Sequence, residues 1–301
     1  MIATHPLADQ PVALQAADQR PDADGREGQM GQPQPARVAL VTGASDGIGR
    51  ACANRLTGAG WTVTGASRRG TAGPNWAGLV MNVDDEAAVK AGVAGVIEAH
   101  GRIDALVAAA GWGVAGAVEN TALSEAQAQF DTNFWGCVRA IQAVLPQMRA
   151  QRSGRIVLIS SLGGVLGIPF QAFYSASKFA LEGLAEALAY EVAPFGIEVT
   201  LVQPGNIKTG FTAARKMAAA AEDDPVYGAA LKKAVGVMER DEINGAPADV
   251  VAATVERVLA ARRPPRRVSS GKAAERVSVL AKRVLPYRVF EVGAKGSLGV
   301  G

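Results

Sequence analysis

Short apolar runs alternate with longer segments of helical periodicity through most of this chain. The runs that have the length of buried strands lie at 37–41, 61–66, 79–83, 105–109, 156–159 and 198–202. The helical patterns between them lie at 48–59, 84–100, 124–149 and 179–195. Because strands that alternate with helices in this way form parallel sheets, the pattern predicts an α/β protein with a doubly wound parallel sheet.

One domain accounts for most of the chain. With 301 residues and a hydrophobic share of 49%, the sequence can bury one large core, which we place at 37–292. Residues 1–36 have no apolar period and lack the basic start and apolar centre of a secretory signal, so we expect a disordered tail. The glycine-rich end, 293–301, is expected to be flexible. No stretch comes close to the length of about twenty consecutive apolar residues that a membrane-spanning helix needs.

Charge and side-chain content argue against several classes of protein. The net charge of +3, without basic residues interleaved with aromatics, does not favour a nucleic-acid partner. Two histidines, His5 and His100, leave little from which to build a metal site. Cys52 and Cys137 fall in predicted helices and suit buried thiols in a reducing compartment. We therefore expect a cytoplasmic protein without a metal centre.

The ends of the predicted strands gather the residues that can bind ligands. Ligands of doubly wound sheets bind beyond the carboxyl ends of the strands. Glycine or polar residues occur at those ends, at 43–49, 67–68, 82, 109–111, 161 and 204–209. We therefore expect one binding edge there.

A glycine-rich turn follows the first strand. Residues 42–49 read Thr-Gly-Ala-Ser-Asp-Gly-Ile-Gly and lead directly into a helical pattern. Glycines permit close backbone approach, and the free N–H groups of a helix start attract a phosphate. The spacing differs from the commoner Gly-X-Gly-X-X-Gly fingerprint. We favour a nucleotide site over a plain turn because strand, turn and helix occur together.

The residues after the second strand bear on the choice of cofactor. In dinucleotide folds this position meets the adenosine ribose, where an acid binds the 2′-hydroxyl and an arginine accommodates a 2′-phosphate. Ser67 followed by Arg68 therefore favours NADP(H) over NAD(H). Two alternatives stay open here: Arg68 and Arg69 are merely solvated charges, or Asp46 in the glycine turn opposes a phosphate.

Tyr174 and Lys178 are four residues apart on the helix after the fifth strand and therefore share one helix face. A nearby ammonium lowers the pKa of a phenol from its ordinary value of about 10. Ser161, at the end of the strand, can supply a hydroxyl to the same point. The three residues predict a proton donor, a cation that tunes it and a hydrogen-bond donor for a carbonyl oxygen. The alternative is an ordinary amphipathic helix face.

Taken together, these motifs resemble the short-chain dehydrogenases/reductases over residues 37–263. The matching residues occur in the order of the family: the 42–49 turn, Asn133, Ser161, Tyr174-Ser-Ala-Ser-Lys178, and Pro204-Gly205 followed by Thr209. The resemblance implies a Rossmann-type fold and an NAD(P)-dependent oxidoreductase that acts on an alcohol/carbonyl pair. Segment 111–210 is most similar to the branch that contains steroid- and retinol-type dehydrogenases.

The resemblance also implies a role for each matching residue. Tyr174 would be the general acid/base, Lys178 would lower its pKa and hold the nicotinamide ribose, and Ser161 would bind the substrate oxygen. Asn133 would bend its helix and hold a water of the proton relay. The implied cofactor-binding residues are Gly43, Ser45, Gly47, Ile48, Gly49, Ser67, Arg68, Asn82, Val83, Ala109, Gly111, Tyr174, Lys178, Pro204, Gly205, Ile207 and Thr209.

Two positions depart from the family pattern. Ala108-Ala109-Ala110-Gly111 stands where the family usually has Asn-Asn-Ala-Gly, so side-chain hydrogen bonds that brace the sheet are lost. Asn82 replaces the usual Asp, although its amide oxygen can still accept a hydrogen bond from adenine. Neither change touches the four catalytic positions.

The segment after the sixth strand is expected to cover the substrate. Residues 206–245 lie where the family has its lid, and 211–240 has a helical pattern with several apolar members. With the apolar stretches 113–114 and 165–170, this lid predicts a roomy pocket for a hydrophobic secondary alcohol or ketone. A plain amphipathic helix is the alternative for any one of these side chains.

The C-terminal part is expected to add a helix at 247–261, a strand at 266–269 and a basic amphipathic helix at 273–285. Such a helix can rest on a membrane surface, but we favour a solvated lysine/arginine face. Members of the family usually associate through the helices of Asn133 and Tyr174, so a homodimer or homotetramer is expected.

Two rival functions remain. A catalytically silent dinucleotide-binding regulator would keep the fold, but it normally lacks the Tyr, Lys or Ser that are all present here. A sugar-nucleotide epimerase or dehydratase of the related extended branch would have a different glycine spacing and a larger C-terminal domain.

Overall fold

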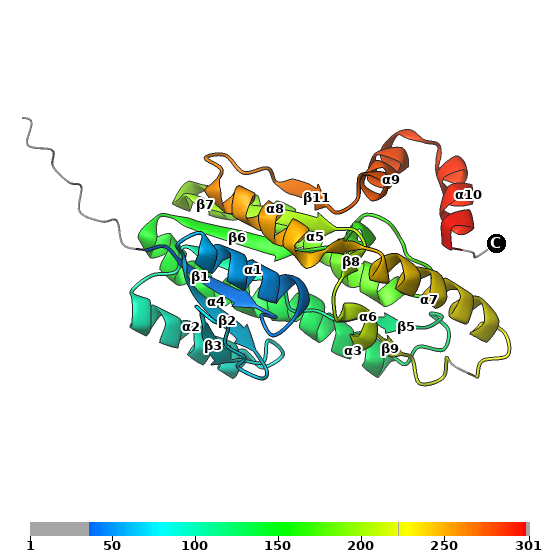
Figure 1. Ribbon diagram of the computed structural model, residues 1–301, viewed down its shortest axis with the longest axis horizontal. Coiled ribbons are helices and arrows are strands. Elements are labelled where there is room, and N and C mark those ends of the chain that lie inside the picture. Colours follow the sequence, from blue (N-terminus) through cyan, green and yellow to red (C-terminus); the bar gives the residue numbers. More distant parts are fainter. Residues whose placement is uncertain (1–35, 222, 299–301) are drawn as a thin grey trace, which may run out of the picture. The chain divides into compact units, whose positions relative to one another are not determined.

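The apolar runs form one parallel sheet. A computed structural model describes residues 36–221 and 223–298, and its seven-stranded sheet has the order β11-β7-β6-β4-β1-β2-β3 (Figure 1). The strands are β1 (Val38–Thr42), β2 (Thr62–Ser67), β3 (Ala77–Val80), β4 (Ala105–Ala108), β6 (Gly154–Ile159), β7 (Ile197–Pro204) and β11 (Arg267–Ser270). The prediction of a single-domain, doubly wound α/β fold is confirmed.

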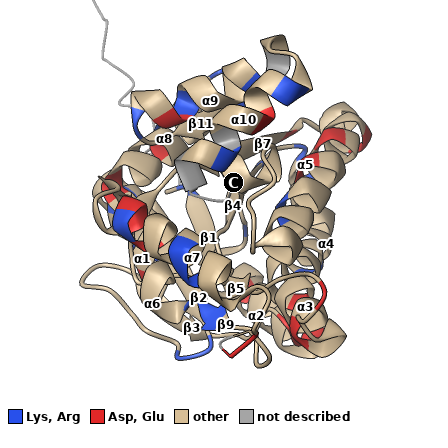
Figure 2. Cartoon of the chain, turned by 90° about the vertical axis from the view of Figure 1, so that its right-hand side faces the viewer, with Lys and Arg blue, Asp and Glu red and all other residues tan. Residues whose placement is uncertain are grey.

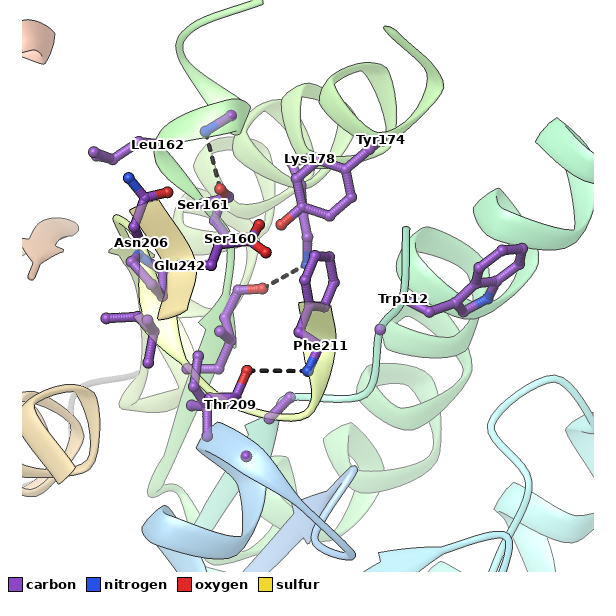
Figure 3. A pocket seen from close by; sticks show the side chains of 18 of the residues that line it. Trp112, Ser160, Ser161, Leu162, Tyr174, Lys178, Asn206, Thr209, Phe211 and Glu242 are labelled. Carbon is purple, nitrogen blue, oxygen red and sulfur yellow. Dashed lines mark hydrogen bonds between the residues drawn. The ribbon is translucent and has the colours of Figure 1, made fainter. Parts of the chain in front are cut away.

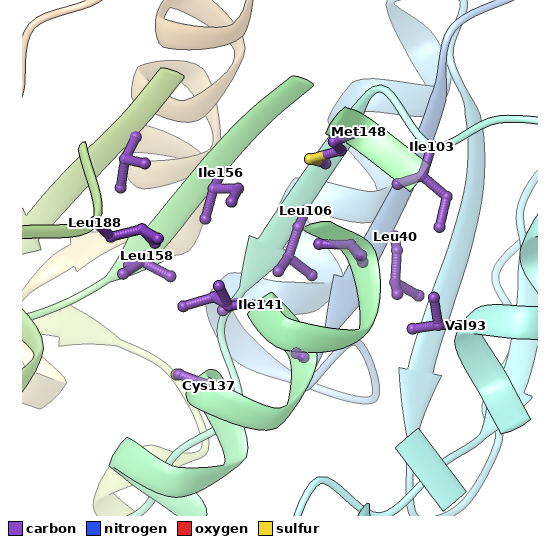
Figure 4. Close-up of a cluster of buried hydrophobic side chains, with 14 of the residues drawn as sticks. Leu40, Val93, Ile103, Leu106, Cys137, Ile141, Met148, Ile156, Leu158 and Leu188 are labelled. Atoms are coloured by element: carbon purple, nitrogen blue, oxygen red, sulfur yellow. The ribbon is translucent and has the colours of Figure 1, made fainter. Parts of the chain in front are cut away.

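Helices cover both faces of the sheet. On one face lie α2 (Glu86–His100), α4 (Gly136–Gln151) and α5 (Ala172–Val192). On the other lie α1 (Gly47–Gly58) and α8 (Ala248–Ala260). Because successive strand residues point to opposite faces, Leu106 packs in the first layer (Figure 4) and Val107 in the second. Burial on both faces is why β1, β4 and β6 are apolar at nearly every position.

The segment around Asn133 is not the single helix expected at 124–149. It consists of α3 (Leu123–Phe130), a π-helical turn (Asp131–Trp135) and α4. The wider turn contains Asn133, whose side-chain amide binds the backbone of Trp112. Single π-helical turns of this kind occur inside α-helices, frequently at functional sites.

The lid also differs from the expected helix over 211–240. The chain instead forms α6 (Phe211–Ala214), β9 (Lys216–Met217) and α7 (Gly228–Ile243), and β9 pairs with β5 (Val114–Ala115). In the turn before α7, the Asp224 carboxylate accepts hydrogen bonds from the backbone N–H groups of Val226 and Tyr227. A carboxylate that accepts from the N–H groups two and three residues later makes the hydrogen bonds of a helix N-cap, and a new helix begins after this turn instead of continuing from α6.

The C-terminal elements follow the prediction as far as α9 (Ala273–Val284). After Pro286 the chain forms α10 (Tyr287–Leu298), which extends into the glycine-rich end that was expected to be flexible from 293. The N-terminal tail (1–35 of it) and residues 299–301 lie outside the described residues. Within 36–221 and 223–298, no helix has both the length and the apolar character to cross a membrane.

Candidate active site

A cavity of about 850 Å³ opens at the carboxyl ends of the strands (Figure 3). Every predicted catalytic and cofactor position except Asn133 lines it. These positions come from the β1–α1 turn, from the ends of β2, β4, β6 and β7, from the segment after β3 and from α5. The fold therefore brings together the residues that the strand-end pattern singled out.

The glycine turn keeps its shape because side chains are absent. A Cβ at Gly49 would lie 2.3 Å from the carbonyl oxygen of Gly43, and a Cβ at Gly43 would lie 2.8 Å from the Ala110 backbone. Gly43 and Gly47 have φ values of +68° and +54°, in the left-handed region that favours glycine. Asp46 precedes α1 without a side-chain cap bond, so the first N–H groups of the helix are left for an anion.

The polar groups near β2 and β3 suit a ribose and a base. The Ser67 hydroxyl is buried and has no hydrogen-bond partner among the described residues. Such a group costs free energy unless a ligand or water pairs with it. Arg68, Asn82 and Val83 line the same cavity. Together with the uncapped start of α1, these residues fit a nicotinamide dinucleotide.

Asn133 is fully buried and braces the turn after β4. Its Oδ1 accepts the Trp112 N–H at 3.0 Å, and its Nδ2 donates to the Trp112 carbonyl oxygen at 3.0 Å and to Ser177 Oγ at 3.3 Å. Both amide hydrogens are thus used within the protein. In this structure Asn133 positions the loop beside the cavity, and the bend expected in its helix is the π-helical turn.

Tyr174, Lys178 and Ser161 converge on the cavity (Figure 3). Tyr174 and Lys178 are 9% and 5% exposed, and the Lys178 Nζ lies 5.8 Å from the centre of the Tyr174 ring. The same Nζ donates to the Ile159 carbonyl oxygen at 2.9 Å. Ser161 Oγ accepts the Gly163 N–H at 2.9 Å, which leaves its own hydrogen free to donate.

The ionisation of this pair differs from the expectation. Burial raises the pKa of the Tyr174 phenol, and the Glu242 carboxylate raises it further. The Ser161 hydroxyl and the Arg215 guanidinium lower that pKa, whereas Lys178 is not among the groups that shift it. Burial lowers the pKa of the Lys178 ammonium itself. The predicted lowering of the Tyr174 pKa is therefore not seen: burial of the phenol raises that pKa, and the Lys178 ammonium donates to the Ile159 carbonyl oxygen.

A buried carboxylate anchors α5 to the sheet beneath the site. Glu182 Oε1 accepts hydrogen bonds from Ser160 Oγ at 2.8 Å and from Gln203 Nε2 at 2.9 Å. Its Oε2 accepts from Arg267 Nε at 2.9 Å. Charge-assisted bonds of this kind are stronger than neutral ones. They join the helix of Tyr174 to β6, β7 and β11 in one unit.

The lid side of the cavity contains residues that sequence reasoning missed. The Phe211 ring packs edge-on against Tyr174 with centroids 5.7 Å apart. Arg215 forms a salt bridge with Glu242, and their side chains are 2% and 13% exposed. Gln171 is 4% exposed and lines the cavity, and its Nε2 has no partner among the described residues. No spacing in the sequence reveals these contacts, because they join α5, α6 and α7, which lie far apart along the chain.

Comparison with known proteins identifies the family. The family model described as short chain dehydrogenase matches residues 37–219. The chain belongs to the short-chain dehydrogenase family. The resemblance seen in the sequence is thereby confirmed. This short-chain dehydrogenase is an oxidoreductase of alcohol or keto groups, and members of the family bind NAD(P).

Curated relatives include lipid- and steroid-modifying enzymes. The chain is 40% identical over 261 residues to a 3-ketodihydrosphingosine reductase of Bacteroides thetaiotaomicron, covering 86% of this chain and 96% of the relative. It is 38% identical to 17-beta-hydroxysteroid dehydrogenase type 1 of Mus musculus, over 58% of this chain and 55% of that protein. A shorter match, 48% identical over 37% of this chain and 36% of the relative, is to human (Homo sapiens) retinol dehydrogenase 8. The predicted steroid- and retinol-type relatives are confirmed.

Solved structures agree with this assignment. A short-chain dehydrogenase from Streptomyces avermitilis has a TM-score of 0.75 and 34% identity, covering 89% of this chain and 98% of that chain. A short-chain dehydrogenase/reductase from Burkholderia phymatum in complex with NAD has a TM-score of 0.72 and 25% identity, over 86% of this chain and 95% of that one.

Proposed function

We propose that this short-chain dehydrogenase transfers a hydride between NADP(H) and a hydrophobic secondary alcohol or ketone, with Tyr174 as general acid/base. One observation carries the proposal: a single cavity joins the glycine turn to Ser161, Tyr174 and Lys178. A nucleotide on the turn and a ketone beside Ser161 would share that cavity. The complete set of three side chains gives no support to a silent regulator.

The chain's own residues account for the proton chemistry. Bound NADP(H) would supply the hydride. The Ser161 hydroxyl would donate a hydrogen bond to the ketone oxygen and hold it next to Tyr174. Tyr174 would give its phenolic proton to that oxygen as the alcohol forms, and take it back in the reverse direction. Because its pKa is raised, the phenol is protonated near neutral pH, as a donor must be. Lys178 would hold the nicotinamide ribose.

The preference for NADP(H) is part of the proposal. Ser67 and Arg68 follow β2 and line the cavity, and no carboxylate stands at those two positions to bind a ribose 2′-hydroxyl. The Arg68 guanidinium would instead pair with a 2′-phosphate.

Replacement of Arg68 tests this preference. In the Arg68→Ala variant we expect the Kd for NADPH to rise about tenfold or more, because one charge-assisted hydrogen bond is lost. The Kd for NADH should change less than about twofold, since NADH has no 2′-phosphate. Fluorescence titration of both nucleotides against parent and variant gives the measurement. Equal weakening of both, or a parent that binds NADH more tightly, contradicts the assignment.

The walls of the cavity favour a long apolar substrate with a polar end. Its apolar lining includes Leu162, Leu166, Ile168, Phe211, Met238, Leu285 and Phe290. Gln171 and Glu242 add polar groups to the same cavity. We propose 3-ketodihydrosphingosine as substrate, which carries a hydroxyl and an amine next to its ketone and a long alkyl chain. The 40% identity to a reductase of that name supports the choice.

A carbonyl panel tests the substrate class. We expect turnover of 3-ketodihydrosphingosine, followed by steroid, retinoid and long-chain ketones, with little reaction of small polar ketones. The rate of NADPH consumption with each compound provides the ranking. Reaction of small polar ketones alone would show that the cavity does not select apolar chains.

Gln171 is expected to recognise the polar end of that substrate. Its unpartnered Nε2 can donate to a hydroxyl oxygen, which a leucine of similar size cannot. For Gln171→Leu we expect the ratio of kcat/KM for 3-ketodihydrosphingosine to that for a plain long-chain ketone to fall about tenfold, the value of one buried hydrogen bond. Steady-state kinetics on both compounds measure the ratio. An unchanged ratio would remove Gln171 from the recognition of the polar end.

Assembly and location complete the proposal. Trp135 and Phe179 are 51% and 42% exposed on the π-helical turn and α5, the region through which members of the family associate. We therefore propose a homodimer or homotetramer. Cys52 and Cys137 are free and buried, in keeping with a cytoplasmic protein.

A further inference from the structure

The last two helices form one wall of the cavity. On α9, Ser278 and Ala281 line the cavity, and Leu285 continues this lining after the helix. On α10, Val289, Phe290 and Gly293 do the same. Figure 2 shows α9 and α10 next to each other. Any ligand that enters near this wall must pass these helices.

A different face of α9 is apolar and unpartnered. Val277, Leu280 and Val284 recur at helical spacing and are 60%, 59% and 68% exposed. On α10, Tyr287 and Val292 are 71% and 73% exposed. We call these five residues the α9–α10 surface. Single exposed apolar residues are ordinary, but a group of them on adjacent helices marks a binding surface.

The same segment is strongly basic. Residues 272–298 contain six lysines and arginines and two glutamates, a net charge of +4, whereas the whole chain has +3. Arg276 and Arg288 are exposed, one on each helix. The positive charge of the protein is therefore concentrated beside its exposed apolar face.

We infer that the α9–α10 surface binds an anionic lipid bilayer, with the apolar residues in the interfacial layer and the arginines on lipid headgroups. An amphipathic helix with a basic polar face and an apolar face lies in the plane of a membrane interface. Lysine and arginine near an anionic leaflet contribute additional attraction. The same helices line the cavity, so docking brings the cavity wall to the lipid.

Charge decides between a bilayer and a second copy of the chain. Two copies that met through this surface would bring together two segments of net charge +4. Like charges across an interface oppose association, whereas an anionic leaflet complements them. The inference concerns binding to lipid and does not depend on which ketone is reduced.

Flotation with lipid vesicles tests the inference on the full chain. We expect the parent to float with vesicles of phosphatidylcholine and phosphatidylglycerol and to remain unbound with phosphatidylcholine alone. The Arg276→Gln/Arg288→Gln variant should lose about thirtyfold in partition coefficient, from about 1 kcal/mol for each cation. The Val277→Gln/Leu280→Gln/Val284→Gln variant should lose about tenfold or more, because its apolar contacts are removed. None of the five positions substituted in these two variants lines the cavity.

Matched substitutions elsewhere provide the control. Val80 and Val226 are 72% and 75% exposed and lie outside the cavity lining, so Val80→Gln/Val226→Gln should float like the parent. A parent that does not float with anionic vesicles, or surface variants that float equally well, would overturn the inference. A change of oligomeric state in the apolar variant with unchanged flotation would assign the surface to a second copy and overturn it as well. Because flotation needs no turnover, failure of the proposed reaction leaves this result intact.

Discussion

Replacing Tyr174 by phenylalanine is expected to lower kcat by about a hundredfold to ten-thousandfold, the range that general acid–base catalysis contributes. The substitution removes only the phenolic oxygen, and the ring keeps its edge-on contact with Phe211. NADPH binding should persist, because the glycine turn and Lys178 are unchanged. Single-turnover reduction of 3-ketodihydrosphingosine, together with an NADPH titration, separates the loss of chemistry from a loss of binding.

Tyr190 offers a matched control on the same helix. It is 71% exposed on α5 and does not line the cavity, so Tyr190→Phe should retain the parent's kcat. A Tyr174→Phe variant that oxidises NADPH as fast as the parent would refute the role of Tyr174. A parent that binds NADPH but oxidises none of it with any carbonyl would instead favour the silent regulator.

The second large effect is expected at Gly49. A methyl group there would lie 2.3 Å from the Gly43 carbonyl oxygen, a backbone atom that cannot move aside without changing the turn. For Gly49→Ala we expect a loss of about 1–3 kcal/mol in the free energy of unfolding, typical of overpacking. NADPH affinity should fall as well, since the first N–H groups of α1 are displaced. Thermal unfolding with and without NADPH measures both effects.

Gly58, at the other end of α1, is the control. A Cβ there would meet nothing within 4 Å, so Gly58→Ala should be neutral or stabilising by up to about 1 kcal/mol. The two variants make the same chemical change in one helix. If both leave the unfolding midpoint and NADPH affinity unchanged, close packing of the glycine turn is not what shapes the site.

Local pattern predicted the sheet and most of the site. Buried parallel strands must be apolar on both faces, so β1, β4, β6 and β7 stand out as runs, and the residue types change where each run ends. The four-residue spacing of Tyr174 and Lys178 placed them on one face of α5. These features depend on contacts close in sequence or on the regular register of the sheet.

Features that depend on distant contacts escaped prediction. The π-helical turn contains Asn133, whose side chain forms hydrogen bonds with the distant backbone of Trp112. The lid is interrupted where β9 pairs with β5 and where the Asp224 carboxylate binds the turn before α7. α10 lies against a cavity that exists only after folding. The Tyr174 pKa was misjudged for the same reason. Helical spacing places Lys178 near the phenol, but the ammonium turns to the Ile159 carbonyl in the folded chain.

The Glu182 network separates two parts of the active site. Ser161 and Tyr174 belong to a block in which β6, β7, β11 and α5 are bonded to one buried carboxylate. Gln171 directly precedes α5, whereas Phe211 and Glu242 belong to the lid (206–245), which lies outside that network. Lid substitutions that do not act on Tyr174 should therefore alter which ketones are accepted while the proton-transfer geometry stays fixed. Substitutions of Phe211 or Glu242 should affect both, because these residues contact Tyr174 or shift its pKa. For engineering, the lid is the place to change substrate range, and the Glu182 block is the part to leave untouched.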